Sequence, residues 1–202
     1  MARRGETVIL AAGDFPKKGS AAFRILAAAK RVVACDGAAD EYRRRMRRWP
    51  AVIVGDMDSS RCAKPKCEVV RVPDQNTNDL EKAARLCAER GWSGPVVLGA
   101  AGKREDHTIG NVFRALDLGL EVVTDHGRFV PVEGTARFRV RKGTPVSVFA
   151  TSPSARVAST GLEWPLDGVR FRNLYRATLN RVSGSVVTIS STRRIYVFFA
   201  SV

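Results

Sequence analysis

The sequence predicts an α/β protein with two domains, a parallel-sheet domain followed by a small all-β sandwich. In the first part of the chain, short strand-like runs alternate with stretches of helical composition, which is typical of a parallel sheet covered on both faces. After about residue 127 the helical patterns stop, and β-rich runs follow, separated by Gly, Pro and Ser clusters at roughly ten-residue spacing. We therefore expect a Rossmann-like domain over residues 1–127 and a β-sandwich over residues 128–202.

The first domain is predicted to alternate strands with helices. The expected strands are Thr7–Ala11, Arg31–Cys35, Ala51–Gly55, Glu68–Val72, Pro95–Gly99 and Leu120–Thr124. The expected helices are Ser20–Lys30, Ala38–Arg48, Asn78–Arg90 and Asp106–Leu118. Helix starts are marked by side chains that can accept a hydrogen bond from the first turn, namely Ser20 in one case and Thr77 or Asn78 in another.

The second domain is predicted from short β-rich runs alone. These runs are Arg137–Val140, Val146–Ala150, Arg156–Ser159, Val169–Phe171, Val186–Ser190 and Ile195–Ala200. Residues 131–202 contain only three acidic side chains, those of Glu133, Glu163 and Asp167. Chemistry that needs carboxylates is therefore expected in the first domain.

Composition excludes several classes of protein. With 45% hydrophobic and 27% charged residues, the chain is not disordered as a whole. No apolar run approaches the roughly 20 residues that cross a bilayer, and the N-terminal residues do not form a secretory signal. The cysteines Cys35, Cys62, Cys67 and Cys87 form no CxxC pair, so neither a zinc site nor a disulfide framework is expected. We expect a cytoplasmic protein with reduced thiols.

The formal net charge of +14 leaves a nucleic-acid-binding protein open as an alternative. The most basic stretch is Arg43–Arg48, which holds five arginines around Met46 on a predicted helix. A charge run on a helix is usually a solvated face, and no aromatic side chains are interleaved with it. Nucleic-acid binding is therefore the weaker hypothesis.

Aspartates follow nearly every strand of the predicted parallel sheet. The segments just past the strand ends are Gly13-Asp14, Asp36-Gly37, Gly55-Asp56-Met57-Asp58-Ser59, Pro73-Asp74-Gln75-Asn76 and the stretch 99–107. A single aspartate at such a place is most often a turn former. Several that converge on one sheet edge repel one another, and a divalent cation offsets this repulsion most simply. Carboxylate oxygens suit Mg²⁺, which also binds substrate phosphates.

Three local patterns strengthen this prediction. Asp56 and Asp58 lie two residues apart in one tight turn. Both carboxylates can therefore face one ion, or one can face the ion while the other faces the substrate. The stretch Gly102–His107 combines glycine, two cations and a helix start, which favours phosphate. Asp79 and Lys82 fall one helical turn apart, a spacing that is often only a solvated ion pair. Because no GxxxxGK[ST] loop and no Ser-His-Asp order are present, the residues indicate Mg²⁺-dependent handling of a phosphorylated substrate.

Taken together, these motifs resemble the thiamin pyrophosphokinase family in order and spacing. The matching residues are Asp36-Gly37-Ala38, Gly55-Asp56-Met57-Asp58-Ser59, Asp74-Gln75 with Asn78-Asp79 and Lys82, Gly102-Lys103-Arg104-Glu105-Asp106-His107 with Asn111, Gly161-Leu162-Glu163-Trp164 and Leu179-Asn180. The resemblance extends over nearly the whole chain.

The resemblance implies an enzyme that transfers a pyrophosphoryl group from ATP to the hydroxyl of thiamin and releases AMP. It implies a nucleotide-binding catalytic domain, a thiamin-binding sandwich, and a homodimer whose active site lies between subunits. By the same resemblance the catalytic carboxylates are Asp36, Asp56, Asp58 and Asp79, with Asp36, Asp56 and Asp58 as Mg²⁺ ligands. The residues expected at nucleotide or phosphates are Gln75, Asn78, Lys82, Lys103, Arg104, Asp106 and His107. Trp164 and Asn180 are expected to bind thiamin.

Two departures from the family pattern matter. Asn78 stands where the family usually has Thr, and it can still cap the helix. Leu179 stands where the family has the Ser of Ser-Asn, which removes a hydroxyl beside the expected thiamin pocket. Leu179 therefore leaves open a pyrophosphokinase that acts on another heteroaromatic alcohol, such as a pterin.

Overall fold

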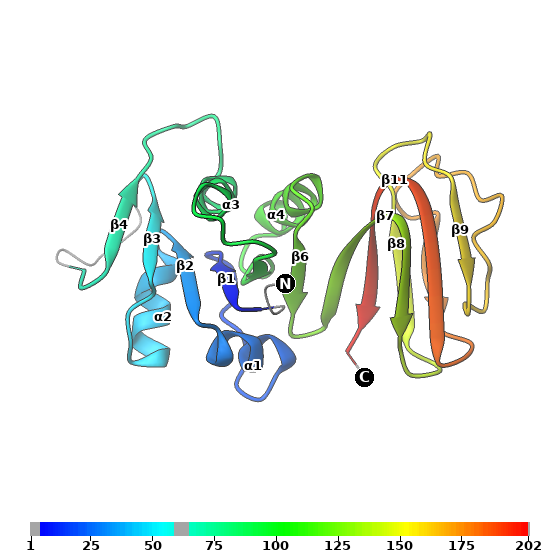
Figure 1. Ribbon diagram of the computed structural model, residues 1–202, viewed down its shortest axis with the longest axis horizontal. Coiled ribbons are helices and arrows are strands. Elements are labelled where there is room, and N and C mark those ends of the chain that lie inside the picture. The colour runs from blue at the N-terminus through cyan, green and yellow to red at the C-terminus, as the bar shows by residue number, and fades with distance from the viewer. Residues whose placement is uncertain (1–4, 59–64, 202) are drawn as a thin grey trace. The chain divides into compact units, whose positions relative to one another are not determined.

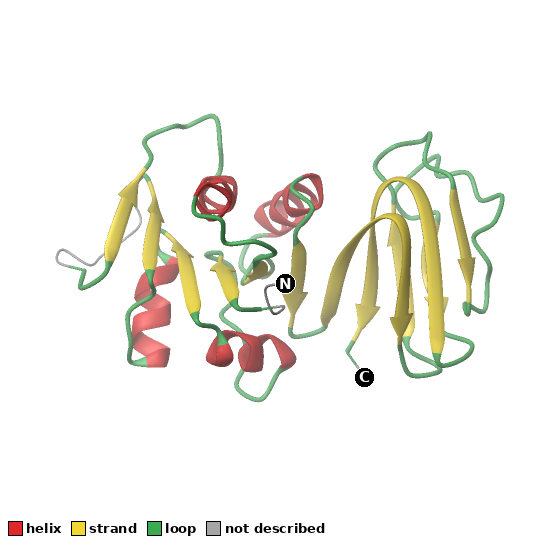
Figure 2. Cartoon of the chain, viewed as in Figure 1, coloured by secondary structure: helices red, strands yellow, loops and turns green. Residues whose placement is uncertain are grey.

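The computed structural model describes residues 5–58 and 65–201, which form two compact units (Figure 1). The first unit ends at Asp125 and the second begins at His126. Ser59 of the predicted acidic turn and Cys62 lie outside the described residues. The two units are of different classes: the first contains helices and strands, whereas the second is built from strands and loops (Figure 2).

The first unit is a parallel sheet, as predicted. Its strands are β1 (Thr7–Leu10), β2 (Arg31–Cys35), β3 (Val52–Gly55), β4 (Glu68–Arg71), β5 (Val96–Leu98) and β6 (Glu121–Thr124). They lie in the order β6-β5-β1-β2-β3-β4, and every neighbouring pair is parallel. The chain builds β2, β3 and β4 on one side of β1 and then places β5 on its other side. The carboxyl ends of β1 and β5 therefore form the topological switch point, where open α/β sheets bind ligands.

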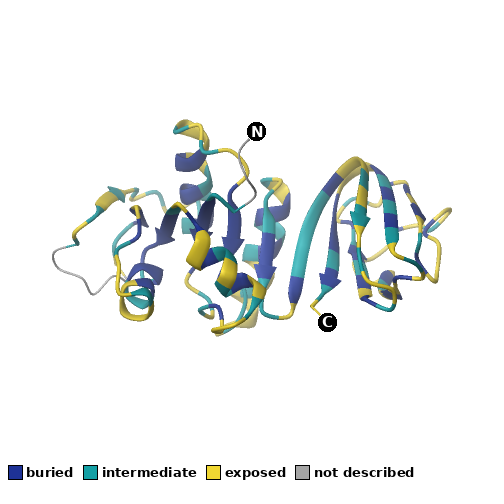
Figure 3. Ribbon diagram, turned by 60° about the horizontal axis from the view of Figure 1, so that its bottom comes forward, coloured by how far each residue is buried: buried dark blue, intermediate teal, exposed yellow. Residues whose placement is uncertain are grey.

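Helices cover both faces of this sheet. They are α1 (Ala21–Ala28), α2 (Ala38–Met46), α3 (Asp79–Glu89) and α4 (Glu105–Asp117). Val8 and Leu10 of β1 are buried in one cluster with Leu26 of α1 and Tyr42 of α2, because alternate strand residues point to one face. Helices α3 and α4 contact each other on the opposite face (Figure 1). Figure 3 shows the buried residues running along the strands between these helix layers.

The predicted caps are confirmed. The side-chain oxygen of Ser20 accepts a hydrogen bond from the backbone N–H of Phe23 at 3.0 Å. The side-chain oxygen of Asn78 accepts one from the backbone N–H of Glu81 at 2.9 Å. Because Asn78 caps α3, the helix begins at Asp79, which places that carboxylate in its first turn.

The second unit is the predicted antiparallel β-sandwich. Its strands are β7 (Gly127–Arg139), β8 (Pro145–Phe149), β9 (Val157–Thr160), β10 (Ala177–Arg181) and β11 (Val186–Ala200). Strand β11 pairs with β7 along its length, with β9 over its first half and with β8 over its second half. The register shifts between Ser191 and Ile195, so the β7–β11 ribbon passes from one layer to the other. A single apolar cluster of the second unit, which includes Val148, Ile189 and Val197, fills the core.

Several predicted strands of the second unit are corrected. Val169–Phe171 is not a strand but part of a loop. Phe171 of this loop is 2% exposed, so the apolar residues of the segment reflect burial in the core and not strand pairing. Val186–Ser190 and Ile195–Ala200 are one strand, since pairing resumes beyond the polar bulge that resembles a turn in sequence. Strand β10 was not predicted, because an edge strand with shifted register lacks a clear alternation. In the described part of the chain, no helix is long and apolar enough to span a membrane.

Candidate active site

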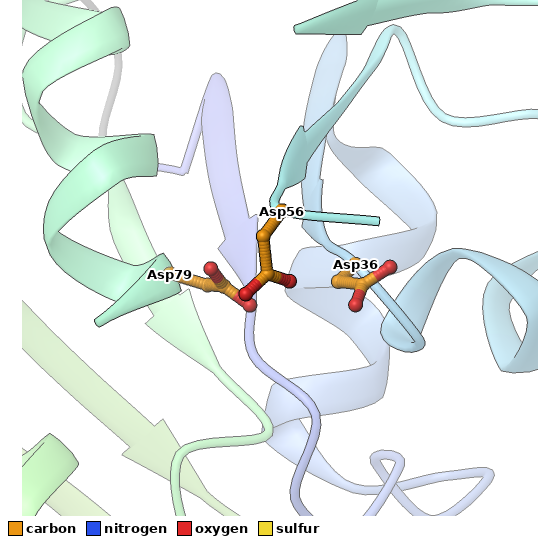
Figure 4. A group of neighbouring side chains, drawn as sticks. All are labelled: Asp36, Asp56 and Asp79. Atoms are coloured by element: carbon orange, nitrogen blue, oxygen red, sulfur yellow. The ribbon is translucent and has the colours of Figure 1, made fainter. Parts of the chain in front are cut away.

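Three carboxylates from distant parts of the sequence meet at the carboxyl edge of the parallel sheet. Asp36 follows β2, Asp56 follows β3, and Asp79 begins α3. One carboxylate oxygen from each lies within 4.8 Å of the others (Figure 4). Since β2 and β3 are adjacent and parallel, their ends deliver Asp36 and Asp56 to the same place. We refer to Asp36, Asp56 and Asp79 as the carboxylate cluster.

The backbone at the end of β3 leaves room for the cluster. Asp36 is 2% exposed and has φ 32°, in the left-handed region that side chains rarely adopt. A Cβ at Gly55 would lie 2.9 Å from Cβ of Asp36 and 3.3 Å from Oδ2 of Asp79. Only glycine therefore allows both aspartates to approach the strand end. The role of Gly55 was not predicted, although a glycine directly before an acidic turn is the signal that identifies it.

Asp56 is held by Gln75, another of the predicted site residues. The Gln75 amide Nε2 donates a hydrogen bond to Oδ2 of Asp56 at 3.0 Å, and the Asp58 backbone N–H donates to Oδ1 at 3.4 Å. The Gln75 hydrogen bond is the main reason why the pKa of Asp56 is lowered. Asp56 is half-buried, so its ionised carboxylate remains within reach of a ligand from solvent.

Asp58 does not join the carboxylate cluster. Met57 adopts φ 67°, and the turn leaves Asp58 exposed. The structure thus brings together Asp36, Asp56 and Asp79, whereas the metal ligands predicted from the family resemblance are Asp36, Asp56 and Asp58. The difference arises because Asp79 reaches the site through the fold, from a helix 23 residues after Asp56 in sequence.

Lys82 supplies a buried positive charge to the cluster. Its side chain is 3% exposed, and Nζ lies 3.1 Å from Oδ1 of Asp79. The pair is therefore not the solvated surface pair that its spacing alone allows. Next to it, burial raises the pKa of the Cys35 thiol, and the negative charge of Asp79 adds to the shift. Cys35 is thus a neutral thiol and not an activated nucleophile.

The β1 and β5 loops are joined at the switch point. The backbone N–H of Gly13 donates to the carbonyl of Gly99 at 2.8 Å, and Nζ of Lys103 donates to the carbonyl of Ala12 at 2.7 Å. A Cβ at Gly13 would lie 2.4 Å from the carbonyl oxygens of Gly99 and Ala101. Glycine at position 13 is thus required for the two loops to touch.

The remaining predicted phosphate ligands lie on the β5–α4 loop and the first turn of α4. Lys103, Arg104, Asp106 and His107 are all exposed. The Arg104 guanidinium contacts the Asp106 carboxylate at 2.6 Å and is the main cause of that carboxyl's lowered pKa. The backbone N–H of His107 also donates to Asp106 at 2.9 Å. The pair lies at the same carboxyl edge as the cluster, because all strands of the sheet are parallel.

In the second unit, the side chain of Asn180 forms hydrogen bonds with the backbone of Trp164. The Asn180 side-chain Nδ2 donates to the Trp164 carbonyl at 2.7 Å, and the Trp164 backbone N–H donates to Oδ1 of Asn180 at 3.2 Å. Asn180 is 5% exposed, whereas Trp164 is 59% exposed. The amide therefore holds the backbone of Trp164, while the indole is exposed to solvent.

Arginines of the basic run at the end of α2 have partners inside the first unit. Arg44 and Arg45 both form ion pairs with Glu41. Arg43 lies over the ring of Trp49 at 4.8 Å, and Arg48 donates to the Tyr42 hydroxyl at 2.7 Å. Four of the five arginines of the run therefore have a partner within the first unit.

A parallel sheet with three carboxylates and a buried lysine at its carboxyl edge is typical of a transferase that handles phosphate groups. Two family models together match most of the chain. Residues 23–123 match the thiamin pyrophosphokinase catalytic domain, and residues 127–198 match the thiamin pyrophosphokinase substrate-binding domain. The chain belongs to the thiamin pyrophosphokinase family.

Curated relatives agree with this assignment, and solved structures share the fold. Thiamin pyrophosphokinase 1 of Caenorhabditis elegans is 30% identical over 187 residues, covering 81% of this chain and 76% of that protein. Thiamine pyrophosphokinase 1 of Oryza sativa subsp. japonica is 30% identical over 152 residues, covering 64% and 58%. Thiamine pyrophosphokinase from Bacillus subtilis has the same fold, with a TM-score of 0.74 at 16% identity over 96% of this chain and 98% of that chain. Thiamin pyrophosphokinase from Geobacillus thermodenitrificans also has a TM-score of 0.74, at 22% identity over 97% of each.

Family membership makes the chain an ATP-dependent diphosphotransferase that acts on thiamin. ATP is its co-substrate, and thiamin diphosphate is its product. A pyrophosphokinase for another alcohol and a nucleic-acid-binding protein are not favoured.

Proposed function

We propose that the carboxylate cluster is the catalytic centre and holds Mg²⁺ together with the phosphates of ATP. The donor set suits this ion, because Mg²⁺ prefers carboxylate oxygens at about 2.0–2.1 Å, and oxygens that share one ion lie within roughly 4 Å of each other. The 4.8 Å limit within which Asp36, Asp56 and Asp79 each offer an oxygen is close to that spacing. When bound, the ion neutralises charge on the transferred group and orients it. Asp58 stays a predicted ligand, from its exposed position beside Asp56.

The transfer forms one bond and breaks one. The thiamin hydroxyl oxygen attacks the β-phosphorus of ATP, the bond from that phosphorus to the α,β-bridging oxygen breaks, and AMP leaves with the bond's electrons. The hydroxyl proton passes to solvent or to a carboxylate. Such reactions depend on positioning and charge neutralisation more than on covalent help. In this proposal Gln75 keeps Asp56 oriented and ionised, and Lys82 prevents repulsion between the carboxylates before substrate binds.

The predicted phosphate ligands fit the same scheme. We assign Lys103, Arg104, Asp106 and His107 to the nucleotide, since they are exposed on the β5–α4 loop at the switch point. Asn78 acts indirectly, because its side chain caps α3 and thereby positions Asp79. Residues up to about 127 then form the nucleotide-binding catalytic domain, and the sandwich binds thiamin.

Trp164 is the proposed thiamin platform, and Asn180 is its positioning residue. The thiazolium ring of thiamin carries a positive charge, which an exposed indole face attracts. Trp164 offers such a face, with 59% of its surface exposed. Asn180 contributes by fixing the backbone of Trp164 through two hydrogen bonds.

The test is to incubate the protein with ATP, Mg²⁺ and thiamin and to measure AMP and thiamin diphosphate together. We expect equal amounts of both products. Asp56→Asn and Asp79→Asn should each lower kcat by at least about 100-fold, because a neutral amide is a poor Mg²⁺ ligand. Asp117→Asn, an exposed change on α4, is the matched control. Turnover that survives both cluster variants would overturn the assignment of the catalytic centre.

We also propose that the protein is a homodimer, on the strength of the family resemblance, and that it is cytoplasmic. The buried thiols of Cys35 and Cys87 support a reducing compartment. If one subunit supplies the carboxylates and its partner supplies Trp164, a mixture of Asp56→Asn and Trp164→Ala proteins should recover about a quarter of wild-type activity. A mixture as inactive as its components would exclude the shared site.

A further inference from the structure

The second unit contains a cavity that the proposed reaction does not use. The cavity has a volume of about 620 Å³ and is formed by the paired strands β7, β11 and β9 together with the loop 167–170. A cavity of this volume is of the size that small-molecule sites have in proteins. None of its lining residues belongs to the carboxylate cluster or to the residues proposed for the nucleotide and for thiamin. The polar side chains of the lining include those of Thr135, Arg156, Asp167, Arg170, Ser190 and Thr192.

The loop that forms one wall of the cavity is held at both ends. Leu166 before it and Phe171 after it are buried in the apolar core of the second unit. The backbone N–H of Leu166 donates to Oγ of Ser159 at 2.9 Å, and the backbone N–H of Ser159 donates to Oδ2 of Asp167 at 3.4 Å. This wall is therefore in place before a ligand arrives, which reduces the entropic cost of binding.

Two arginines of the lining have no anionic partner. Arg156 and Arg170 are exposed, and neither guanidinium forms an ion pair or a hydrogen bond within residues 5–58 and 65–201. Glu133 and Glu163 of the same unit pair with arginines outside the cavity. Asp167 supplies the one carboxylate of the described lining. The lining thus carries two positive charges against one negative charge.

Hydroxyl groups of the lining add further hydrogen-bond donors. Oγ1 of Thr192 accepts a hydrogen bond from the backbone N–H of Arg156 at 3.1 Å, so its own proton can be donated to a ligand. The hydroxyl oxygens of Thr135 and Ser190 lie 2.9 Å apart, and whichever hydroxyl accepts keeps its proton for a ligand. Because each guanidinium has several N–H donors and no acceptor, donors outnumber acceptors in this lining. Such a lining is complementary to an oxyanion.

We propose that this cavity binds a small phosphorylated molecule, whose phosphate group is held by Arg156 and Arg170. A guanidinium forms two parallel hydrogen bonds with phosphate oxygens, a geometry that suits arginine better than lysine. A phosphate ion alone does not fill the cavity, since a water molecule takes only about 30 Å³ of liquid volume. The organic part of a phosphate ester occupies the remaining space, and Asp167 accepts a hydrogen bond from a hydroxyl group of that part.

Amide NMR spectra of the isotope-labelled protein test this proposal at named positions. Inorganic phosphate and glycerol phosphate are titrated separately, without Mg²⁺ and at an ionic strength kept constant with chloride. We expect saturable shifts of the Gly168 and Thr192 amide signals, and the ester should bind about threefold more tightly than phosphate because it adds hydrogen bonds. Arg156→Ala and Arg170→Ala should each weaken binding of the ester about tenfold, since each removes a charge-assisted contact.

Arg176→Ala is the matched control, because Arg176 is an exposed arginine of the same unit outside the described lining. This substitution lowers the net charge equally and should change the affinity by less than about twofold. Equal effects of all three substitutions would overturn the site, because net charge alone would then explain binding. Shifts that do not saturate, or that chloride also produces, would overturn it too.

The two probes decide between a phosphate ester and free phosphate. Equal affinities for glycerol phosphate and inorganic phosphate would overturn the ester and assign the cavity to the free ion. These measurements require no turnover, so their outcome is independent of the proposed function. Turnover of ATP and thiamin should differ by less than about twofold between wild type, Arg156→Ala and Arg170→Ala, because neither arginine belongs to the proposed active site.

Discussion

Lys82 and Asp79 form an ion pair at 3.1 Å in which the lysine side chain is only 3% exposed. The pair spans the first turn of α3, and Asp79 belongs to the carboxylate cluster with Asp36 and Asp56. A buried cation in this position compensates part of the charge that three neighbouring carboxylates bring together. The pair is thus part of the reason why the site can form before any metal or nucleotide binds.

Removal of that cation should destabilise the fold. We expect Lys82→Met to lower the free energy of unfolding by about 2–4 kcal/mol, because the carboxylates lose their buried partner. Urea unfolding measures the change. Lys30→Met removes an exposed lysine, 70% accessible and paired with Glu6, and should cost less than about 1 kcal/mol. Equal effects of the two substitutions would contradict the role given to Lys82.

Gln75 should control the acid limb of the pH–rate profile. The Gln75 hydrogen bond is the main cause of the lowered pKa of Asp56, so Gln75→Ala should let that pKa rise toward its ordinary value of 3.8. The fall of kcat/KM on acidification should then begin at higher pH in the variant. Because the pKa is lower in the folded protein, ionised Asp56 stabilises the fold above its unfolded-state pKa, and this contribution is lost as pH falls through the folded value. An acid limb that superimposes on that of the wild type would count against this explanation.

Gly55 should not tolerate a side chain. In Gly55→Ala the new Cβ would lie 2.9 Å from Cβ of Asp36, so the strand end or the aspartate must move. We expect activity to fall by at least about tenfold, since small displacements at a catalytic site have large effects. Gly110→Ala is the matched control: its Cβ meets nothing within 4 Å inside helix α4, and it should raise stability by about 0.5–1 kcal/mol. A Gly55→Ala enzyme with full activity would show that the close approach is unnecessary.

Asn180 should matter through Trp164. Asn180→Ala leaves the Trp164 carbonyl and N–H without their partner and should cost about 1–3 kcal/mol of stability. It should also raise KM for thiamin more than it lowers kcat, because the indole is misplaced while the carboxylate cluster is intact. Asn173→Ala, on an exposed loop, serves as the control. A variant with normal KM at a temperature where it remains folded would remove Asn180 from the site.

Much of the architecture could be predicted because its signals are local. The alternation of strands and helices, the caps Ser20 and Asn78, and the aspartates that follow β2 and β3 depend on neighbours a few residues away. The second unit was harder, because its strands are joined by long-range pairing. The bulge at Ser191 resembles a turn in sequence, and Phe171 resembles a strand residue because a loop residue can be equally buried.

The sequence by itself determined the fold class, the two-domain order and the family. Hydrophobic periodicity, the residue types that follow each strand and the spacing of motifs are all properties of the order of residues along the chain. Only the tertiary structure decided which carboxylates meet. Asp79 joins Asp36 and Asp56 from a helix, while Asp58, although adjacent in sequence, is turned to solvent. The tertiary structure also decided that Lys82 is buried and that Glu41 forms ion pairs with two arginines of the basic run. It likewise decided that Leu179 is exposed and has a left-handed backbone conformation. Burial and charge pairing depend on contacts across space, and local patterns do not specify them.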